Sequence, residues 1–399
     1  MRESAPLGLA LLLACMSTLS PFSIDTFFPS FRVMRADFGV SSLQMQQTLT
    51  SYMLPYAIMS LFHGSLSDAL GRRAVVLGGL AVYAAASLAC MLAPSFGSLL
   101  LFRAAQGVSA GAGMVVARAV VRDLYDGPAA QRLMSTIMML FSVAPAIAPI
   151  IGGWVQVWLG WHAVFGMLAL LALTLLFACY RLLPETHPVH KRVPFGFRQL
   201  LTGSWQVFAD THFRRLAFAS ALSFSSFLLY IATAPAIVFD HWRLSETQFA
   251  WLFVPGICGM SIGAWLSGRV AGRMAARRQT FLGFSISFVS ALLISAAHLS
   301  FAVVPIYWQQ LALAGLALGL QFAAPVLNLT MLDCFPYMRG TASSVMNFLS
   351  LLLSAVVMGL VGPLLQHSLL LISIYGMFVI AAACGLWYSA LNYAQPRAA

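Results

Sequence analysis

Two ionisable residues, Asp25 and Arg103, stand inside long apolar runs of this 399-residue chain. A charged side chain at the centre of a membrane helix costs about 2.5 to 3.5 kcal/mol unless it is paired or hydrated, so such residues mark ion or substrate pathways. Asp25 lies near the end of one outward-running span and Arg103 near the start of an inward-running one. Both are therefore expected in the outer half of the membrane, where they can approach each other.

A carboxylate in that position can take up a proton or bind a cation, and Arg103 would favour its charged form. The alternatives are a purely structural ion pair or an Asp25 that sits at the wet outer interface. The functional interpretation makes Asp25 the proton or cation site and Arg103 its partner.

A polar hairpin, residues 64–73, carries the second cluster of chemistry between two apolar runs. Glycine permits a tight turn or a close helix approach, and a carboxylate can cap a helix and accept hydrogen bonds from arginines. We expect a charge network that holds one conformation and opens in another; a simple solvated loop is the alternative. The residues of this conformational latch are Gly64, Asp68, Gly71, Arg72 and Arg73.

The elements that must position these residues are membrane helices. The chain is 60% hydrophobic and 8% charged, which is typical of a membrane protein rather than a soluble domain. A spanning helix needs about 20 residues, longer than the ten-residue alternating strands of a barrel. Twelve such runs are expected near residues 7–28, 45–63, 74–93, 97–121, 133–155, 162–183, 215–238, 247–267, 279–298, 303–332, 341–364 and 369–391. The fold class is an all-α integral membrane protein.

The net charge of +11 is distributed along the chain in a way that orients it in the membrane. Of the 22 Lys and Arg residues, Arg32, Arg35 and Arg243 fall in loops of the opposite side and Arg103 near the outer end of a span; the other 18 lie at the termini, after even-numbered spans or, for Arg118, near the inner end of the fourth span. Positive residues concentrate on the cytoplasmic side. Both termini are therefore expected in the cytoplasm, and the basic surplus does not indicate nucleic acid.

The longest polar segment divides the spans into six and six. We expect an N-terminal six-helix bundle at 1–183, a cytoplasmic central loop at 184–214 and a C-terminal six-helix bundle at 215–399. An arginine-rich hairpin after span 8 and an aspartate at the end of span 10 repeat features of spans 2 and 4, which indicates two pseudo-symmetric halves. The central loop also contains spaced apolar residues that predict a helix on the membrane surface. A transporter that rocks two such halves binds its substrate near the midplane.

The energy source is constrained by one residue type. Lys191 is the single lysine, so a Walker A motif is absent and this chain alone cannot drive transport with ATP. A proton gradient is the expected source, with no cofactor and no metal, and the six scattered cysteines predict neither a metal site nor a disulfide.

The hairpin resembles the signature loop between helices 2 and 3 of the major facilitator superfamily: Gly64-x-Leu-x-Asp68-x-x-Gly71-Arg72-Arg73. Arg103-Ala-Ala-Gln106-Gly107-x-x-x-Gly111 is similar to the helix 4 motif of that family. Pro149-Ile-Ile-Gly152-Gly153 is similar to the helix 5 motif of its antiporters, with Ala148 where glycine is common. In the second half Arg269 stands near the position of the acid, so that copy of the loop is degenerate.

A sharper resemblance is to the Bcr/CflA branch, the bicyclomycin and chloramphenicol resistance exporters. It rests on Ser23-Ile-Asp25 before Phe28-Pro29, Arg122-Asp123-Leu-Tyr125, Pro184-Glu185-Thr186 and Gly340-Thr-Ala-Ser-Ser344. The resemblance implies a proton-coupled multidrug exporter of a bacterial inner membrane, expected to act as a monomer. An exporter or uptake porter of small polar metabolites such as amino acids, peptides or sugars is the alternative.

Polar aromatic and amide side chains are the candidates for contact with amphipathic cargo. Aromatic faces and flexible side chains tolerate varied shapes, although core or lipid packing explains any one of them equally well. The candidate cavity residues are Tyr52, Tyr56, Gln106, Tyr230, Trp251 and Asn328.

Two G-x-S-x-G sequences, at 107–111 and 259–263, match the nucleophile elbow of hydrolases. That elbow needs a strand, a turn and a helix, whereas both matches lie within spans, where glycines four apart favour helix packing. No second buried aspartate or zinc-binding histidine pair supports a membrane protease. We do not expect an enzyme.

Overall fold

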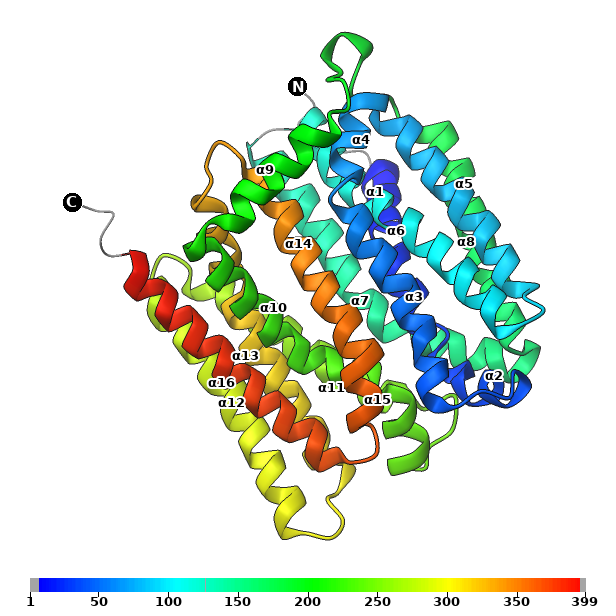
Figure 1. Ribbon diagram of the computed structural model, residues 1–399, viewed down its shortest axis with the longest axis vertical. Helices are drawn as coiled ribbons and strands as arrows, with labels where there is room; N and C mark the ends of the chain where they lie inside the picture. Colours follow the sequence, from blue (N-terminus) through cyan, green and yellow to red (C-terminus); the bar gives the residue numbers. More distant parts are fainter. Residues whose placement is uncertain (1–6, 126, 395–399) are drawn as a thin grey trace. The chain divides into compact units, whose positions relative to one another are not determined.

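The computed structural model describes residues 7–125 and 127–394, and this part of the chain is helical with no strand (Figure 1). By residue contacts the chain separates into two compact units, Met1–Leu200 (unit 1) and Leu201–Ala399 (unit 2). The dividing point falls within the polar segment that follows the sixth long helix.

Unit 1 contains six long helices and several short ones. The long helices are α1 (Leu7–Asp25), α3 (Ser42–Ser60), α5 (Arg72–Met91), α6 (Phe96–Leu124), α7 (Gly127–Leu159) and α8 (Trp161–Leu182). The short elements are η1 (Phe28–Ser30), α2 (Phe31–Asp37), α4 (His63–Leu70) and η2 (Val189–Lys191). Helix α9 (Phe197–Ala209) follows and crosses the dividing point.

Unit 2 repeats the set of six. Its long helices are α10 (Thr211–Ala232), α11 (Ala250–Val270), α12 (Ala276–Ser300), α13 (Ile306–Asp333), α14 (Arg339–Val356) and α16 (Leu369–Ala394). Two π-helical turns, η3 (Ala236–His241) and η4 (Val357–Val361), extend α10 and α14, and α15 (Gly362–Leu365) follows η4.

Ten helical segments in the described residues are long and apolar enough to cross a membrane. The remaining two long helices are α3, which is rich in Ser, Thr and Gln, and α7, whose apolar part in the searched residues is Val143–Leu159. Together they correspond to the twelve predicted spans. The first span is longer than expected, since its helical segment continues through η1 and α2 to Asp37.

The two units share one packing order. In unit 1, α1 packs on α6, α7 and α8, α3 packs on α6, and α5 packs on α6 and α8. In unit 2, α10 packs on α13, α14 and α16, α11 packs on α13, and α12 packs on α13 and α16. When the helices are numbered in order within each unit, the pairs coincide, so the two units are pseudo-symmetric copies of one bundle.

Glycines set the closest helix approaches. A Cβ built on Gly107 of α6 would overlap the carbonyl oxygen of Tyr52 in α3, and one on Gly259 of α11 would overlap that of Ala314 in α13. Both G-x-S-x-G sequences therefore lie in packed helices, as the packing interpretation predicted. A Cβ at Gly113 of α6 would lie 2.6 Å from the carbonyl oxygen of Met16 in α1.

Candidate functional site

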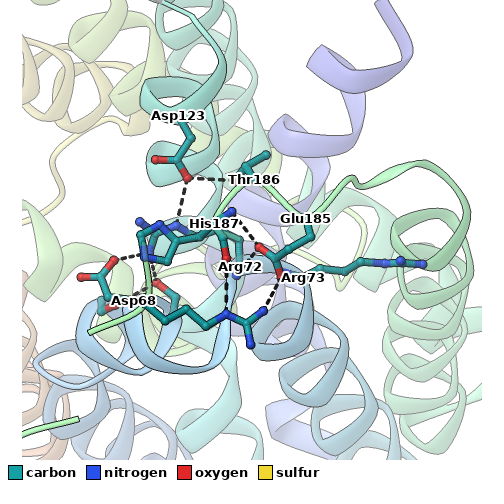
Figure 2. Close-up of polar contacts among 10 residues, drawn as sticks. Asp68, Arg72, Arg73, Asp123, Glu185, Thr186 and His187 are labelled. Carbon is teal, nitrogen blue, oxygen red and sulfur yellow. Dashed lines mark hydrogen bonds and ion pairs between the residues drawn. The ribbon is translucent and has the colours of Figure 1, made fainter. Parts of the chain in front are cut away.

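The polar hairpin of unit 1 becomes α4, a one-residue break at Gly71 and the start of α5. Arg72 is the first residue of α5, is 7% exposed, and joins three segments of the chain (Figure 2). Its Nη1 lies 2.5 Å from Oδ1 of Asp68 and donates to Oγ of Ser67 at 2.6 Å. Its Nε donates to Oδ2 of Asp123, at the end of α6, at 3.1 Å.

The segment after α8 closes this cluster from the other side. Glu185 accepts hydrogen bonds from the backbone N–H groups of Arg72 (3.0 Å) and Arg73 (3.3 Å). These are unpaired donors at the start of α5, so a carboxylate there stabilises the helix through both hydrogen bonds and the helix dipole. Glu185 also lies 3.6 Å from the guanidinium of Arg192, and Thr186 donates to Asp123 at 2.8 Å.

We call this set the Arg72 network: Asp68, Arg72, Asp123, Glu185, Thr186 and Arg192. Its half-buried charges are paired with each other and with backbone donors, the arrangement in which charge-assisted hydrogen bonds are strongest. It ties α4, α5, α6 and the segment after α8 into one body. Arg73 adds a hydrogen bond of 2.5 Å to the carbonyl oxygen of Tyr180 in α8.

The two hairpin glycines differ in what they do. Gly71 has φ +98°, and a Cβ there would overlap the carboxylate of Glu185 and lie 2.6 Å from Nη2 of Arg192. Gly64 was expected to allow a tight turn or a close helix approach, but it lies inside α4, where a Cβ would meet Val115 at 4.0 Å, an ordinary contact. Only Gly71 is required by the backbone and the packing of the network.

Sequence reasoning did not place Asp123, Glu185, Thr186 or Arg192 in the latch. The first three stand in the motifs that carried the family resemblance, Arg122-Asp123 and Pro184-Glu185-Thr186. The position of these motifs beside polar loops was the signal that the sequence offered. Which carboxylate pairs with which arginine depends on how α6 and α8 pack around α5.

Arg103 of α6 is completely buried within unit 1. Its guanidinium lies between the rings of Phe27 and Tyr52, 4.4 Å from each centroid. Its Nη1 donates to Oε1 of Gln106 at 2.8 Å and to Oγ of Ser23 at 3.4 Å, whereas Nη2 is buried with no hydrogen-bond partner. Ring faces and neutral oxygens thus stabilise a cation that forms no ion pair with a carboxylate of the described residues.

Asp25, the last residue of α1, is 4% exposed. In the described part of the chain its carboxylate forms no ion pair, so the direct contact with Arg103 that the sequence suggested is not made in this conformation. The reason is angular: Ser23 faces Arg103, and a residue two positions later points about 200° away around a helix. The two groups nevertheless lie on the packed helices α1 and α6.

The candidate cavity residues are divided between the two units. Tyr52, Tyr56 and Gln106 are buried in unit 1, where Gln106 links Arg103 to Ser87 by a 2.7 Å hydrogen bond. Gln106 therefore orients Arg103. In unit 2, Tyr230 is half-buried, while Trp251 and Asn328 are exposed.

The antiporter-like sequence lies in α7 between residues 149 and 153. Pro149, Gly152 and Gly153 are all buried, and a Cβ on Gly152 would overlap the carbonyl oxygen of Thr26, directly after Asp25. The motif therefore brings α7 into backbone contact with the end of α1.

The sequence from residue 13 to 358 matches the family model described as Major Facilitator Superfamily. The chain belongs to this superfamily. The relatives of this major facilitator include the bicyclomycin resistance protein homolog of Haemophilus influenzae, 28% identical over 89% of this chain and 88% of the relative. A chloramphenicol resistance protein of Pseudomonas aeruginosa is 28% identical over 89% and 83%, and multidrug resistance protein D of Escherichia coli is 26% identical over 95% and 96%. These are the relatives that membership of the Bcr/CflA branch predicts.

Solved structures agree with the fold. The superfamily member resembles a D-xylose-proton symporter with a TM-score of 0.73 at 14% identity over 95% of this chain and 97% of the other. It also resembles a bacterial homologue of the human lysosomal transporter Spinster, with a TM-score of 0.71 at 16% identity over 96% of each chain. At these identities the likeness concerns the fold alone. It is a multi-pass membrane protein of a family of transporters.

Proposed function

We propose that this major facilitator exports amphipathic drugs, such as chloramphenicol-like or bicyclomycin-like compounds, in exchange for protons. Relatives named for bicyclomycin, chloramphenicol and multidrug resistance, which align over most of their length, support this cargo class. The membrane is the inner membrane of a bacterium, with both termini and the Arg72 network on the cytoplasmic side, where the positive loops belong.

The observation that carries the proposal is the pair of unmatched buried charges in unit 1. Among the described residues Asp25 has no counter-ion, and Nη2 of Arg103 is buried without a hydrogen-bond partner. Burying a charged group without a partner is costly, so each group favours any change that supplies one. A proton or a cationic drug can satisfy the carboxylate, and both compete for it.

Competition for one carboxylate gives exchange. When Asp25 is ionised, the positive charge of Arg103 on the adjacent helix attracts it; when Asp25 binds a proton or a cation, that attraction is lost. The two charge states therefore favour different packings of α1 against α6. A proton that moves down a membrane potential supplies about 2.3 kcal/mol per 100 mV, enough to drive export against a gradient.

The Arg72 network has the complementary role of holding one of these packings. It joins α4, α5 and α6 through partly buried charge contacts, and opening it would expose or separate several charges at once. Such a cluster is either formed or broken, so it acts as a two-state element and does not deform continuously.

Proton release in inverted membrane vesicles tests the function. A pH gradient is formed, and chloramphenicol, a cationic dye, an amino acid and a sugar are added one at a time, with vesicles lacking the protein as the blank. We expect drugs to dissipate the gradient. Dissipation by the amino acid or the sugar alone would replace drug export with metabolite transport.

The variant Asp25→Asn tests the site. It should reduce drug-dependent proton release to the blank while the protein stays inserted and folded. Asp37→Asn is the matched control, because Asp37 accepts a 2.7 Å hydrogen bond from Trp161 that an amide oxygen can also accept. Undiminished coupled export by Asp25→Asn would remove the proposed role of Asp25.

A further inference from the structure

The side chain of Phe27 lies against Arg103 and is close to Asp25 in the chain. Its ring centroid is 4.4 Å from the guanidinium carbon of Arg103, and both side chains are completely buried. A cation over an aromatic face is attracted by the ring quadrupole, most strongly where water is absent. Only Thr26 separates Phe27 from Asp25, so the carboxyl group and this ring belong to the same end of α1.

The geometry of this segment makes the ring and the carboxylate alternatives for Arg103. Ser23 faces Arg103 and accepts a hydrogen bond from it at 3.4 Å. Phe27 follows four residues later with a right-handed helical backbone, and residues four apart in a helical segment share a face. Asp25, midway between them, points to the opposite side. A rotation that brought the carboxylate toward Arg103 would therefore carry the ring of Phe27 away from it.

The second ring on Arg103, that of Tyr52, is held differently. It also lies 4.4 Å from the guanidinium, but its hydroxyl forms a 3.1 Å hydrogen bond with Ser20, in the body of α1. Phe27 has no polar atom in its side chain, and its ring contacts those of Phe31 and Phe165, with centroids 5.0 Å and 5.9 Å away. Phe27 is thus the ring that is free to move with the end of α1.

The charges around Arg103 leave room for only these partners. Among the described residues the ionisable groups that act on its guanidinium are those of Tyr52, Tyr83 and Cys90, which are neutral side chains near pH 7. No charged group of the same residues acts on Asp25. A buried cation without a counter-ion is costly, so the guanidinium gains from the ring face or from an ionised Asp25.

We propose that Phe27 is a positioning residue for proton exchange: its ring holds the guanidinium of Arg103 while Asp25 is protonated and gives it up to the ionised carboxylate. The inference rests on the proposed function of Asp25. The arrangement described above, with the guanidinium on the ring and no ion pair to Asp25, is the one that suits the protonated state. A stronger ring contact therefore favours proton binding, and a weaker one favours proton release.

Fluorinated phenylalanines at position 27 test the contact without removing the ring. Fluorine draws electrons from the ring face, so mono-, di- and trifluorinated phenylalanine weaken its attraction for a cation step by step. A desolvated contact of this kind contributes about 2 kcal/mol, a factor of about 30. We expect the midpoint of the pH dependence of drug-dependent proton release to move to lower pH by up to about 1.5 units across the series. An unchanged midpoint, or one that moves to higher pH, would overturn the proposal.

Phe165 gives the matched control series. It is completely buried, its ring lies 5.9 Å from that of Phe27, and it has no cation contact among the described residues. The same fluorinated residues at this position should leave the midpoint unchanged, while both series change the Tm to a similar extent. An equal shift of the midpoint in the two series would show a packing effect and contradict the role of the ring face.

Fluorine NMR separates this inference from the proposed function, because it needs no transport. A single fluorinated phenylalanine is placed at position 27 of the full-length protein in nanodiscs, where its resonance reports the cation at the ring face. We expect the resonance to change with pH and to stay at its low-pH value in Asp25→Asn, whose side chain is always neutral. A resonance that does not change with pH, or that changes equally in Asp25→Asn, would overturn the role of Phe27. The expected titration without any drug-dependent proton release would support that role and reject drug export.

Discussion

Units 1 and 2 share a packing order but differ in where they bury charge. In unit 1, Asp25, Arg72 and Arg103 are each at most 7% exposed. In unit 2, the buried polar side chains of the described residues are Ser, Thr and Gln, and none carries a full charge. A duplicated helical bundle therefore does not require duplicated electrostatics, and the ion chemistry is concentrated in one copy.

One matching position shows how the second copy does without charge. Leu66-Ser67 corresponds to Leu266-Ser267 in the repeat. Ser67 accepts a hydrogen bond from the guanidinium of Arg72, whereas Ser267 accepts one from the neutral amide of Gln279 at 2.7 Å. The amide also donates to the carbonyl oxygen of Phe322 at 3.0 Å, so it is satisfied without a carboxylate.

The acidic helix ends differ in the same direction. Asp123 pairs with Arg72 where their side chains are 21% and 9% exposed. Asp333 pairs with Arg339 where the side chains are 66% and 59% exposed. An exposed ion pair contributes little to stability, because water and salt screen it. The unit 1 network is therefore the one that can hold a conformation.

The largest expected difference in proton-coupled transport is between a substitution of Arg103 and one of Gln279. Arg103→Met removes the buried cation, and a coupling free energy of about 1 to 3 kcal/mol predicts a loss of proton-coupled transport of about 5- to 150-fold. Gln279→Met removes neutral hydrogen bonds and should lower stability by about 1 to 2 kcal/mol while coupled transport continues. Drug-dependent proton release measures the coupled transport, and thermal melting measures the stability. Equal loss of transport in both variants would contradict the division between the units.

The next largest difference, in stability, is expected between substitutions of two glycines that both have positive φ. Gly71→Ala places a methyl group against Glu185 and Arg192 and should destabilise unit 1 by about 3 kcal/mol, because strain adds to lost hydrogen bonds. Gly272→Ala, at φ +73° with no atom within 4 Å of the added Cβ, should cost about 1 kcal/mol. Melting of the two purified variants gives the comparison. A similar fall in Tm would mean that packing against Glu185 contributes nothing.

The smallest difference in stability is expected between substitutions of Asp123 and Asp333. Asp123→Asn keeps an amide oxygen that can accept from Arg72 but loses the charge, and it should cost about 1 to 2 kcal/mol. Asp333→Asn should change stability by about 0 to 1 kcal/mol because its pair is exposed. High salt supplies a second measurement: it should reduce the difference between Asp333→Asn and the unchanged protein more than that for Asp123→Asn. The opposite order would make the unit 2 pair the stronger one.

Much of the fold could be predicted because hydropathy and length specify spans directly. The twelve helices and the loop motif around Asp68 and Arg72 were predicted from the sequence, since both are local patterns. Contacts between spans were harder. Glu185 reaches Arg72 across 113 positions, and no local pattern specifies which carboxylate caps which helix.

The candidate site shows the same limit at finer scale. Asp25 and Arg103 were predicted to approach each other from depth in the membrane alone, which does not give the direction of a side chain around its helix. Ser23 occupies the direction toward Arg103 instead. Gln106 was expected in a cargo cavity, whereas it accepts a hydrogen bond from the buried Arg103. The sequence alone does not distinguish an amide that contacts a ligand from one that contacts another side chain of the protein.

The glycine contacts of α1 have a mechanical consequence. Gly113 of α6 rests on the carbonyl of Met16, and Gly152 of α7 rests on that of Thr26, so α1 is in backbone contact with a neighbour near its middle and just beyond its end. Close backbone contact at these two points opposes a movement of α1 along its own axis. Under the proposed function, a proton that binds at Asp25 would therefore change the packing of α1 against α6 by a rotation or tilt about these two contacts, and the displacement of each atom would grow with its distance from them.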